Sequence, residues 1–168
     1  MAEFVNTVDV LGDDAVSTAL IEKTLTTFYD NVITTVGRNG LAHLPNLTDV
    51  KLPLAEDTGR SGFYGDKALK QVDLTSVLNI SEYSFYGCSA LTALILRGST
   101  VCTLESTNAL TGTPITSGTG YIYVPRALVD SYKAATNWST YSAQFRALED
   151  FTVDGTVTGE LDETKIAA

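Results

Sequence analysis

Apolar positions recur at one constant interval between Val36 and Arg97, with a period of about 22 residues. They fall into four columns that keep this spacing without an insertion: Leu41, Phe63 and Phe85; Leu47, Leu69 and Leu91; Val50, Val72 and Leu94; Leu52, Leu74 and Leu96. A leucine pattern with a period of about 20–29 residues is typical of solenoids, in which each repeat adds one strand to a shared sheet. We therefore expect an α/β (α+β) solenoid, a short right-handed coil of about 22-residue units with helical caps at both ends.

Within each unit, the alternation of apolar and polar residues predicts one strand. Val50 and Leu52 alternate with Asp49 and Lys51, which is the period-two pattern of a strand with one buried face. Before each strand, one large apolar residue lies among small ones, as in residues 84–87. We expect a short helical turn there, with the large residue filling the core.

The repeat boundaries divide the chain into four expected segments. These are an N-terminal helical cap over residues 1–23, the solenoid over residues 24–125, a C-terminal helical cap over residues 126–150, and an acidic tail over residues 151–168 with a hairpin around Asp154 and Gly155. The N-terminal cap is expected to hold a helix over residues 13–24. Leu25 and Phe28 lie one repeat period before Leu47 and Val50, which predicts a first strand over residues 24–29.

The C-terminal elements follow a looser pattern. A stretch rich in Gly, Thr and Ser, residues 111–120, predicts a loop before the last strand, residues 121–125. Beyond Pro125, apolar residues at helical spacing predict one amphipathic helix whose stripe continues through Trp138, Tyr141, Phe145 and Leu148. The stripe favours a core that closes the end of the coil, with a ligand pocket as the less favoured interpretation.

Two segments carry a resemblance to a known family. Residues 80–92, ISEYSFYGCSALT, resemble the I-x-x-x-A-F-x-x-C-x-x-L unit of BspA-type leucine-rich repeats. Residues 121–151 resemble the C-terminal cap of short phage- and prophage-encoded members, with the pattern YVP followed by LVD-x-YK-x-A-x-NW. The chain departs from the family at Leu44 and Asp66, which stand in the column of Cys88, where the family has cysteine.

The resemblance implies a non-enzymatic binding or structural module. The favoured setting is a phage virion-associated protein, in the tail, a fibre or the capsid decoration, that mediates protein or host-surface recognition. One alternative is an intracellular phage effector that binds and inhibits a host defence protein. The other is a bacterial cell-surface adhesin-like repeat protein, which the N-terminal sequence favours least because it lacks the basic and apolar regions of a secretory signal.

Charge and composition restrict the partners. The chain has 168 residues, a net charge of −9 and a pI near 4.4, which argues against binding nucleic-acid phosphates and anionic membranes. No apolar run approaches the roughly 18 residues of a membrane span. We expect a protein partner, either a virion component or a host protein, or a glycan, with no nucleic acid and no membrane insertion. The expected location is the virion or the host cytoplasm. The sequence leaves open whether the chain forms a homo-oligomer.

The reactive side chains do not assemble into a catalytic motif. His43 is the single histidine and occupies a turn position, while Cys88 and Cys102 form no C-x-x-C pair. The glycines match neither a P-loop nor a dinucleotide motif. We therefore expect no enzyme, no cofactor and no metal.

The sheet face is the first expected binding surface, because strand residues that alternate with the core positions form exposed columns. The residues expected to bind there are Lys51, Gln71, Asp73, Ile95, Arg97, Tyr121 and Tyr123. Aromatic residues and arginine are enriched at interface hot spots. The alternative is that the C-terminal members simply pack under the loop 111–120. A second candidate is the convex side, where Tyr64, Tyr83 and Tyr86 are expected.

Overall fold

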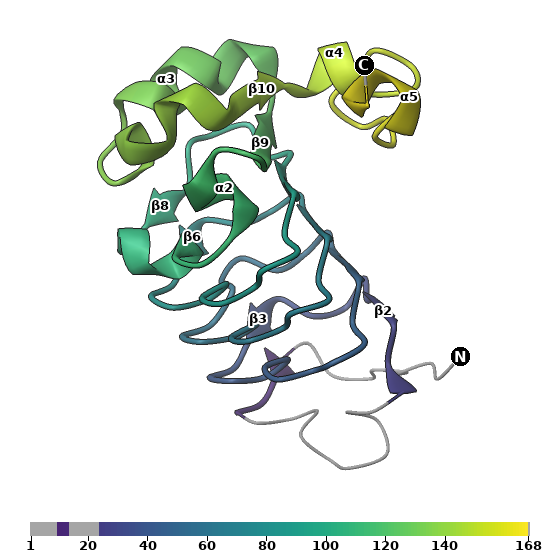
Figure 1. The fold of residues 1–168 in the computed structure, drawn as a ribbon, viewed down its shortest axis with the longest axis vertical. Helices are drawn as coiled ribbons and strands as arrows, with labels where there is room; N and C mark the ends of the chain where they lie inside the picture. The colour runs from purple at the N-terminus through teal and green to yellow at the C-terminus, as the bar shows by residue number, and fades with distance from the viewer. Residues whose placement is uncertain (1–9, 14–23, 168) are drawn as a thin grey trace.

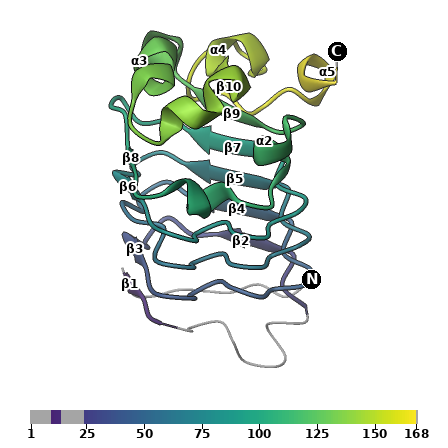
Figure 2. The same ribbon diagram turned by 60° about the vertical axis from the view of Figure 1, so that its left-hand side comes forward.

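A computed structural model gives the structure of the chain and describes residues 10–13 and 24–167. Within these residues the centre of the fold is a six-stranded parallel sheet (Figure 1). Its strands, in spatial order, are β10 (Phe145–Ala147), β9 (Tyr121–Val124), β7 (Ala93–Leu96), β5 (Gln71–Leu74), β4 (Asp49–Leu52) and β2 (Thr27–Tyr29). Figure 2 shows the strands stacked one above another, with β10 and α3 (Val129–Ala134) at the end beyond β9.

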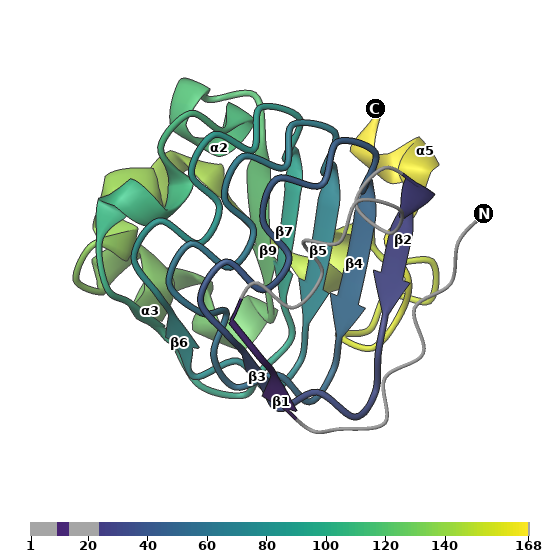
Figure 3. The same ribbon diagram turned by 90° about the horizontal axis from the view of Figure 1, so that it is seen from below.

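The chain leaves each strand of this sheet and returns to it by way of two other sides. On one side are two two-stranded parallel sheets, β1 (Val10–Leu11) with β3 (Thr35–Val36) and β6 (Asn79–Ile80) with β8 (Thr103–Leu104). On the other, which we call the turn side, lie the stacked turns 38–43, 60–65 and 82–87 and the 3-10 helix η1 (Thr107–Leu110). Figure 3, seen from below, shows the large sheet on one side of the molecule and β1, β3 and β6 away from it.

The repeat period of the sequence becomes the register of the sheet. Val50 pairs with Val72, and Val72 with Leu94, so that each apolar column stacks on itself. Leu94 pairs with Ile122, a longer step than the regular period, because the connection contains η1 and the one-turn helix α2 (Pro114–Ser117). The strands predicted over residues 24–29 and 121–125 are confirmed as β2 and β9. Burying each such side chain contributes roughly 1.5–3 kcal/mol to folding.

The predicted fold class, a solenoid with helical caps at both ends, is wrong. The structure is a mixed α/β fold built on the parallel sheet, with few helices among the described residues. The expected helical turns do not form in residues 38–43, 60–65 and 82–87, because each of these turns enters the left-handed region twice, as at Ser61 (φ 56°) and Gly65 (φ 73°). A right-handed helix cannot continue through such residues. The N-terminal cap, including the helix expected over residues 13–24, falls almost wholly outside the described residues.

The C-terminal cap is not one amphipathic helix. Residues 126–151 form η2 (Arg126–Leu128), α3, η3 (Trp138–Gln144), β10 and α4 (Leu148–Phe151). Phe145 lies in β10 and pairs with Ile122 of β9, so residues 121–125 are not the last strand. The Phe145 ring packs on Tyr132 at 5.3 Å between ring centroids, and this contact with the main core fixes the strand. Nowhere in residues 10–13 and 24–167 is a helix long and apolar enough to span a membrane.

Candidate recognition surface

The structure places the predicted sheet-face residues in the expected columns but does not leave them free. Lys51 pairs with Asp73, Asp73 with Ile95, and Ile95 with Tyr123 across neighbouring strands. However, Asp73, Ile95 and Tyr123 are at most 3% exposed. The prediction that they form an open binding face is therefore wrong.

Residues 152–167, which we call the C-terminal strap, cover these positions together with α4. The apolar contacts form one cluster, composed of Ala93, Ile95, Tyr123, Leu148 and Leu161 with Tyr121, Phe151, Val157 and Ile166 packed against it. The chain turns back within the strap, since Thr152 and Leu161 form an antiparallel bridge. The acidic side chains Glu160 and Glu163 of the end are exposed, as expected, but Leu161 is buried and α5 (Glu163–Ile166) packs on the sheet cluster through Ile166. The strap, and not the loop 111–120, supplies the apolar cover.

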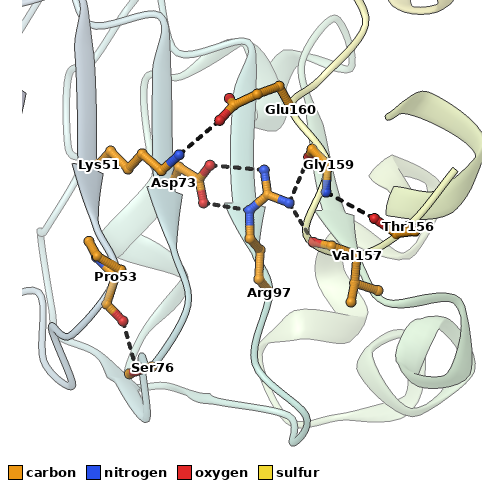
Figure 4. A network of polar contacts seen from close by, with 9 residues as sticks. All are labelled: Lys51, Pro53, Asp73, Ser76, Arg97, Thr156, Val157, Gly159 and Glu160. Atoms are coloured by element: carbon orange, nitrogen blue, oxygen red, sulfur yellow. Dashed lines mark hydrogen bonds and ion pairs between the residues drawn. The ribbon is translucent and has the colours of Figure 1, made fainter. Parts of the chain in front are cut away.

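Arg97 and Lys51 hold the strap by polar contacts (Figure 4). Arg97 pairs with Asp73 through Nε–Oδ1 at 2.8 Å and Nη2–Oδ2 at 3.0 Å. Its Nη1 donates to the carbonyl oxygens of Val157 and Gly159. Lys51 Nζ lies 2.9 Å from Glu160 Oε1, and this hydrogen bond lowers the pKa of Glu160. These predicted binding residues do bind polypeptide, but the polypeptide is the protein's own.

Part of the predicted set stays accessible. Lys51, Gln71 and Tyr121 are half-buried, and the Arg146 guanidinium lies 4.3 Å from the Tyr121 ring centroid. Lys51 and Gln71 line one cleft beside the strap, and Gln71 and Tyr121 line another.

The turn side, the second predicted surface, carries a cluster of half-exposed tyrosines. Tyr64 and Tyr86, which are one repeat period apart, stack with ring centroids at 5.1 Å and an interplanar angle of 9°. The Tyr83 ring meets the Tyr86 ring edge-on, with the ring centroids 5.7 Å apart. The ring centroids of His43 and Tyr64 are 5.4 Å apart. All three tyrosines are half-buried, so the expectation that they are exposed is confirmed only in part.

Arginine completes this cluster. The Arg60 guanidinium lies 5.8 Å from the Tyr83 ring centroid, and Arg60 Nη2 lies 3.5 Å from Glu82 Oε2. An open groove of about 580 Å³ runs among the rings, and its other lining residues include Arg38 and Asn108. We call Arg38, Arg60, Tyr64, Tyr83, Tyr86 and Asn108 the tyrosine–arginine surface.

Backbone geometry explains how the sequence presents these rings. Asn39, Ser61 and Tyr83 occupy the same position in successive turns, and all adopt positive φ, of 54°, 56° and 60°. Asn tolerates this region, whereas a bulky residue there is a clear outlier; the left-handed conformation costs roughly 1–2 kcal/mol. Strained residues cluster at functional sites. Sequence reasoning missed the strain, although a tyrosine in register with an asparagine was a readable signal.

The buried polar groups show no sign of nucleophilic chemistry. Asp66 is fully buried, its Oδ1 accepts from the Leu44 amide at 2.7 Å, and burial raises its pKa to about 9. Burial likewise raises the pKa of the Cys88 thiol and raises that of Cys102 to about 11, so both thiols stay protonated and inert at neutral pH. In the described part of the chain, no three His, Cys, Asp or Glu residues are grouped to hold a metal ion.

No protein-family model matches this chain. No curated protein matches it in sequence either.

Proposed function

We propose that this chain is a non-enzymatic recognition module that binds a protein partner through the tyrosine–arginine surface. The observation that carries the proposal is the packed group of half-exposed Tyr64, Tyr83 and Tyr86 rings with Arg60 against Tyr83. Tyrosine and arginine are the residue types enriched at interface hot spots, where a few side chains supply most of the binding energy.

The rings are already ordered before a partner arrives. Tyr64 and Tyr86 restrain each other by stacking, and Tyr83 is restrained by Tyr86 and Arg60. Binding therefore immobilises few additional rotamers, and ordering each rotamer-rich side chain would otherwise cost about 0.5–1.5 kcal/mol. Tyrosine also combines a large apolar area with a hydroxyl that can donate or accept.

The arrangement favours a protein over a glycan. A sugar ring packs on the open face of an aromatic ring, but Tyr64 and Tyr86 turn one face to each other at 5.1 Å. The Arg60 side chain lies by the Tyr83 ring. The surface thus offers mainly ring edges, hydroxyl groups and guanidinium groups, which suit the mixed polar and apolar surface of a protein.

The setting we propose is a phage virion, in the tail, a fibre or the capsid decoration. Support comes from the resemblance of residues 80–92 and 121–151 to short phage-encoded members of the BspA-type family. The module would be attached to the particle through the tyrosine–arginine surface, which would bind another virion protein.

Quantitative mass spectrometry of purified particles tests both the virion setting and the role of the tyrosine–arginine surface. We expect a stoichiometric copy number for the unmodified chain and at least a tenfold lower one for Tyr86→Ala, since hot-spot truncations cost about 2 kcal/mol or more. Tyr29→Ala is the matched control, because Tyr29 is 63% exposed and lies on β2, outside the surface. Absence of the unmodified chain from particles would overturn the virion setting. Equal incorporation of both variants would instead reject this surface as the attachment site.

A further inference from the structure

The C-terminal strap is held by a group that recognises main chain. Arg97 is 7% exposed at its side chain and keeps Asp73 on one edge of its guanidinium. From Nη1 it donates to two carbonyl oxygens of the strap, those of Val157 and Gly159. Because carbonyl oxygens belong to every polypeptide, this contact depends on the path of the main chain and not on the side chains of the segment that crosses the sheet.

Apolar and acidic side chains of the strap fill complementary positions beside Arg97. Leu161 is buried on the cluster that contains Ile95 and Tyr123. Glu160 reaches Lys51 at 2.9 Å, with both side chains substantially exposed, so this ion pair adds orientation and little stability. The sheet face therefore selects a carboxylate next to an apolar residue on a main chain whose carbonyl oxygens meet Arg97.

The strap is lightly attached for a segment of this length. Residues 153–156, which form its turn, are all exposed, and Val153 is 67% exposed. Two cavities of about 290 and 380 Å³ lie between the sheet and the strap, the first walled by Glu160 and the second by Glu163 and Ile166. A segment with an exposed turn and open clefts beneath it opens at lower free energy than the strands of the sheet.

We infer that the sheet face under the strap is a binding site for an acidic polypeptide segment of another protein, and that the strap fills this site in the free chain. The chemistry of the incoming segment is that of residues 157–161, Val-Thr-Gly-Glu-Leu. This site is on the large sheet, away from the turn side, and the inference is independent of the proposed function.

A labelled synthetic peptide of residues 150–167 is the probe. The strap of the same chain competes at an effective concentration of about millimolar, so the full chain is weakened in the strap by Val157→Asp and Leu161→Asp, which leaves the sheet face unchanged. We expect fluorescence anisotropy to show binding to this variant at least tenfold tighter than to the unmodified chain. Adding Arg97→Lys to this variant keeps the positive charge but removes the two-sided hydrogen bonding of the guanidinium, and it should abolish peptide binding. A peptide carrying Leu161→Asp is the matched control and should not bind.

The inference fails if the weakened variant keeps its circular dichroism and Trp138 fluorescence but does not bind the peptide. Hydrogen exchange on the unmodified chain is a second test, for the case in which the variant unfolds. The amides of Val153 and Asp162, which donate to Glu160 and Phe151, should exchange at least a hundredfold faster than amides of β5 and β7; equal protection would make the strap a fixed part of the fold and reject the site. A concentration-dependent dimer with exchanged straps would assign the site to a second copy and overturn the assignment to another protein.

Discussion

At the scale of single residues, Asp66 places a carboxyl group where the neighbouring repeats have Leu44 and Cys88. Its Oδ2 is buried and has no hydrogen-bond partner among the described residues. Burial raises its pKa from 3.8 to about 9, so the folded chain holds this proton more tightly than the unfolded chain. The free energy of unfolding should therefore fall as pH rises from about 4 to 9, by at most about 1.4 kcal/mol per pH unit.

Asp66→Asn tests this assignment. The amide oxygen can still accept from Leu44, but the side chain no longer ionises, so the fall in stability between pH 5 and 8.5 should disappear. Denaturant titrations at several pH values measure the free energy of unfolding and thus this fall. Asp130→Asn, an exposed position on α3, should keep the unmodified profile. A profile shared by all three chains would mean that Asp66 is ionised in the fold.

Tyr83 separates stability from recognition. Its left-handed backbone conformation has a cost, whereas its ring contacts Tyr86 and Arg60. Tyr83→Asn, which introduces the residue type found at position 39 in an earlier turn, should leave the free energy of unfolding within about 1 kcal/mol of the unmodified value. Incorporation into particles should fall at least tenfold, as expected for a hot spot. A loss of stability above about 2 kcal/mol would show that the ring is mainly structural.

At the scale of elements, the turn side depends on close approach of backbone. A Cβ at Gly62 would lie 1.9 Å from the carbonyl oxygen of Thr58, so Gly62→Ala must displace main chain that pairs with the turns above and below. We expect a loss of about 3 kcal/mol in chemical denaturation. Gly12→Ala, whose added Cβ meets no atom of the described residues within 4 Å, should change stability by less than about 0.5 kcal/mol. Similar denaturation midpoints for the two variants would contradict the close approach of backbone at Gly62.

The elements that sequence could predict are those fixed by local alternation. β4 and β5 follow directly from residues such as Val50 and Leu52, which alternate with polar neighbours, whereas the all-apolar β7 follows from the repeat period. β10 could not be predicted from the sequence, because its pairing with β9 depends on the packing of Phe145 against Tyr132 in the folded chain. The strap was missed for the same reason, since Arg97 finds its carbonyl partners in a segment far along the chain, at Val157 and Gly159. The columns of residues on the sheet face could therefore be predicted from the sequence, but the strap that covers them could not.

At the scale of the whole molecule, one core joins both ends of the sheet. A single cluster of buried side chains runs from Phe28 in β2 to Trp138 and Phe145 at the opposite end. The strap and α4 add a second cluster on the other face of the sheet. The turn side and the sheet face are consequently supported by the same strands, and a partner on either one acts on a continuous scaffold.

Cooperative unfolding follows from this continuity. Trp138 is the single tryptophan, is buried at the C-terminal end, and reports that end by fluorescence, while circular dichroism reports the whole chain. Phe28→Ala, at the other end, should cost about 3–5 kcal/mol and lower both melting midpoints together by roughly 10 °C. Val153→Ala, at an exposed strap position, should leave both midpoints unchanged. If Trp138 fluorescence kept its original midpoint while the circular dichroism midpoint fell, the two ends would unfold separately, because the shared core would then transmit no stability between them.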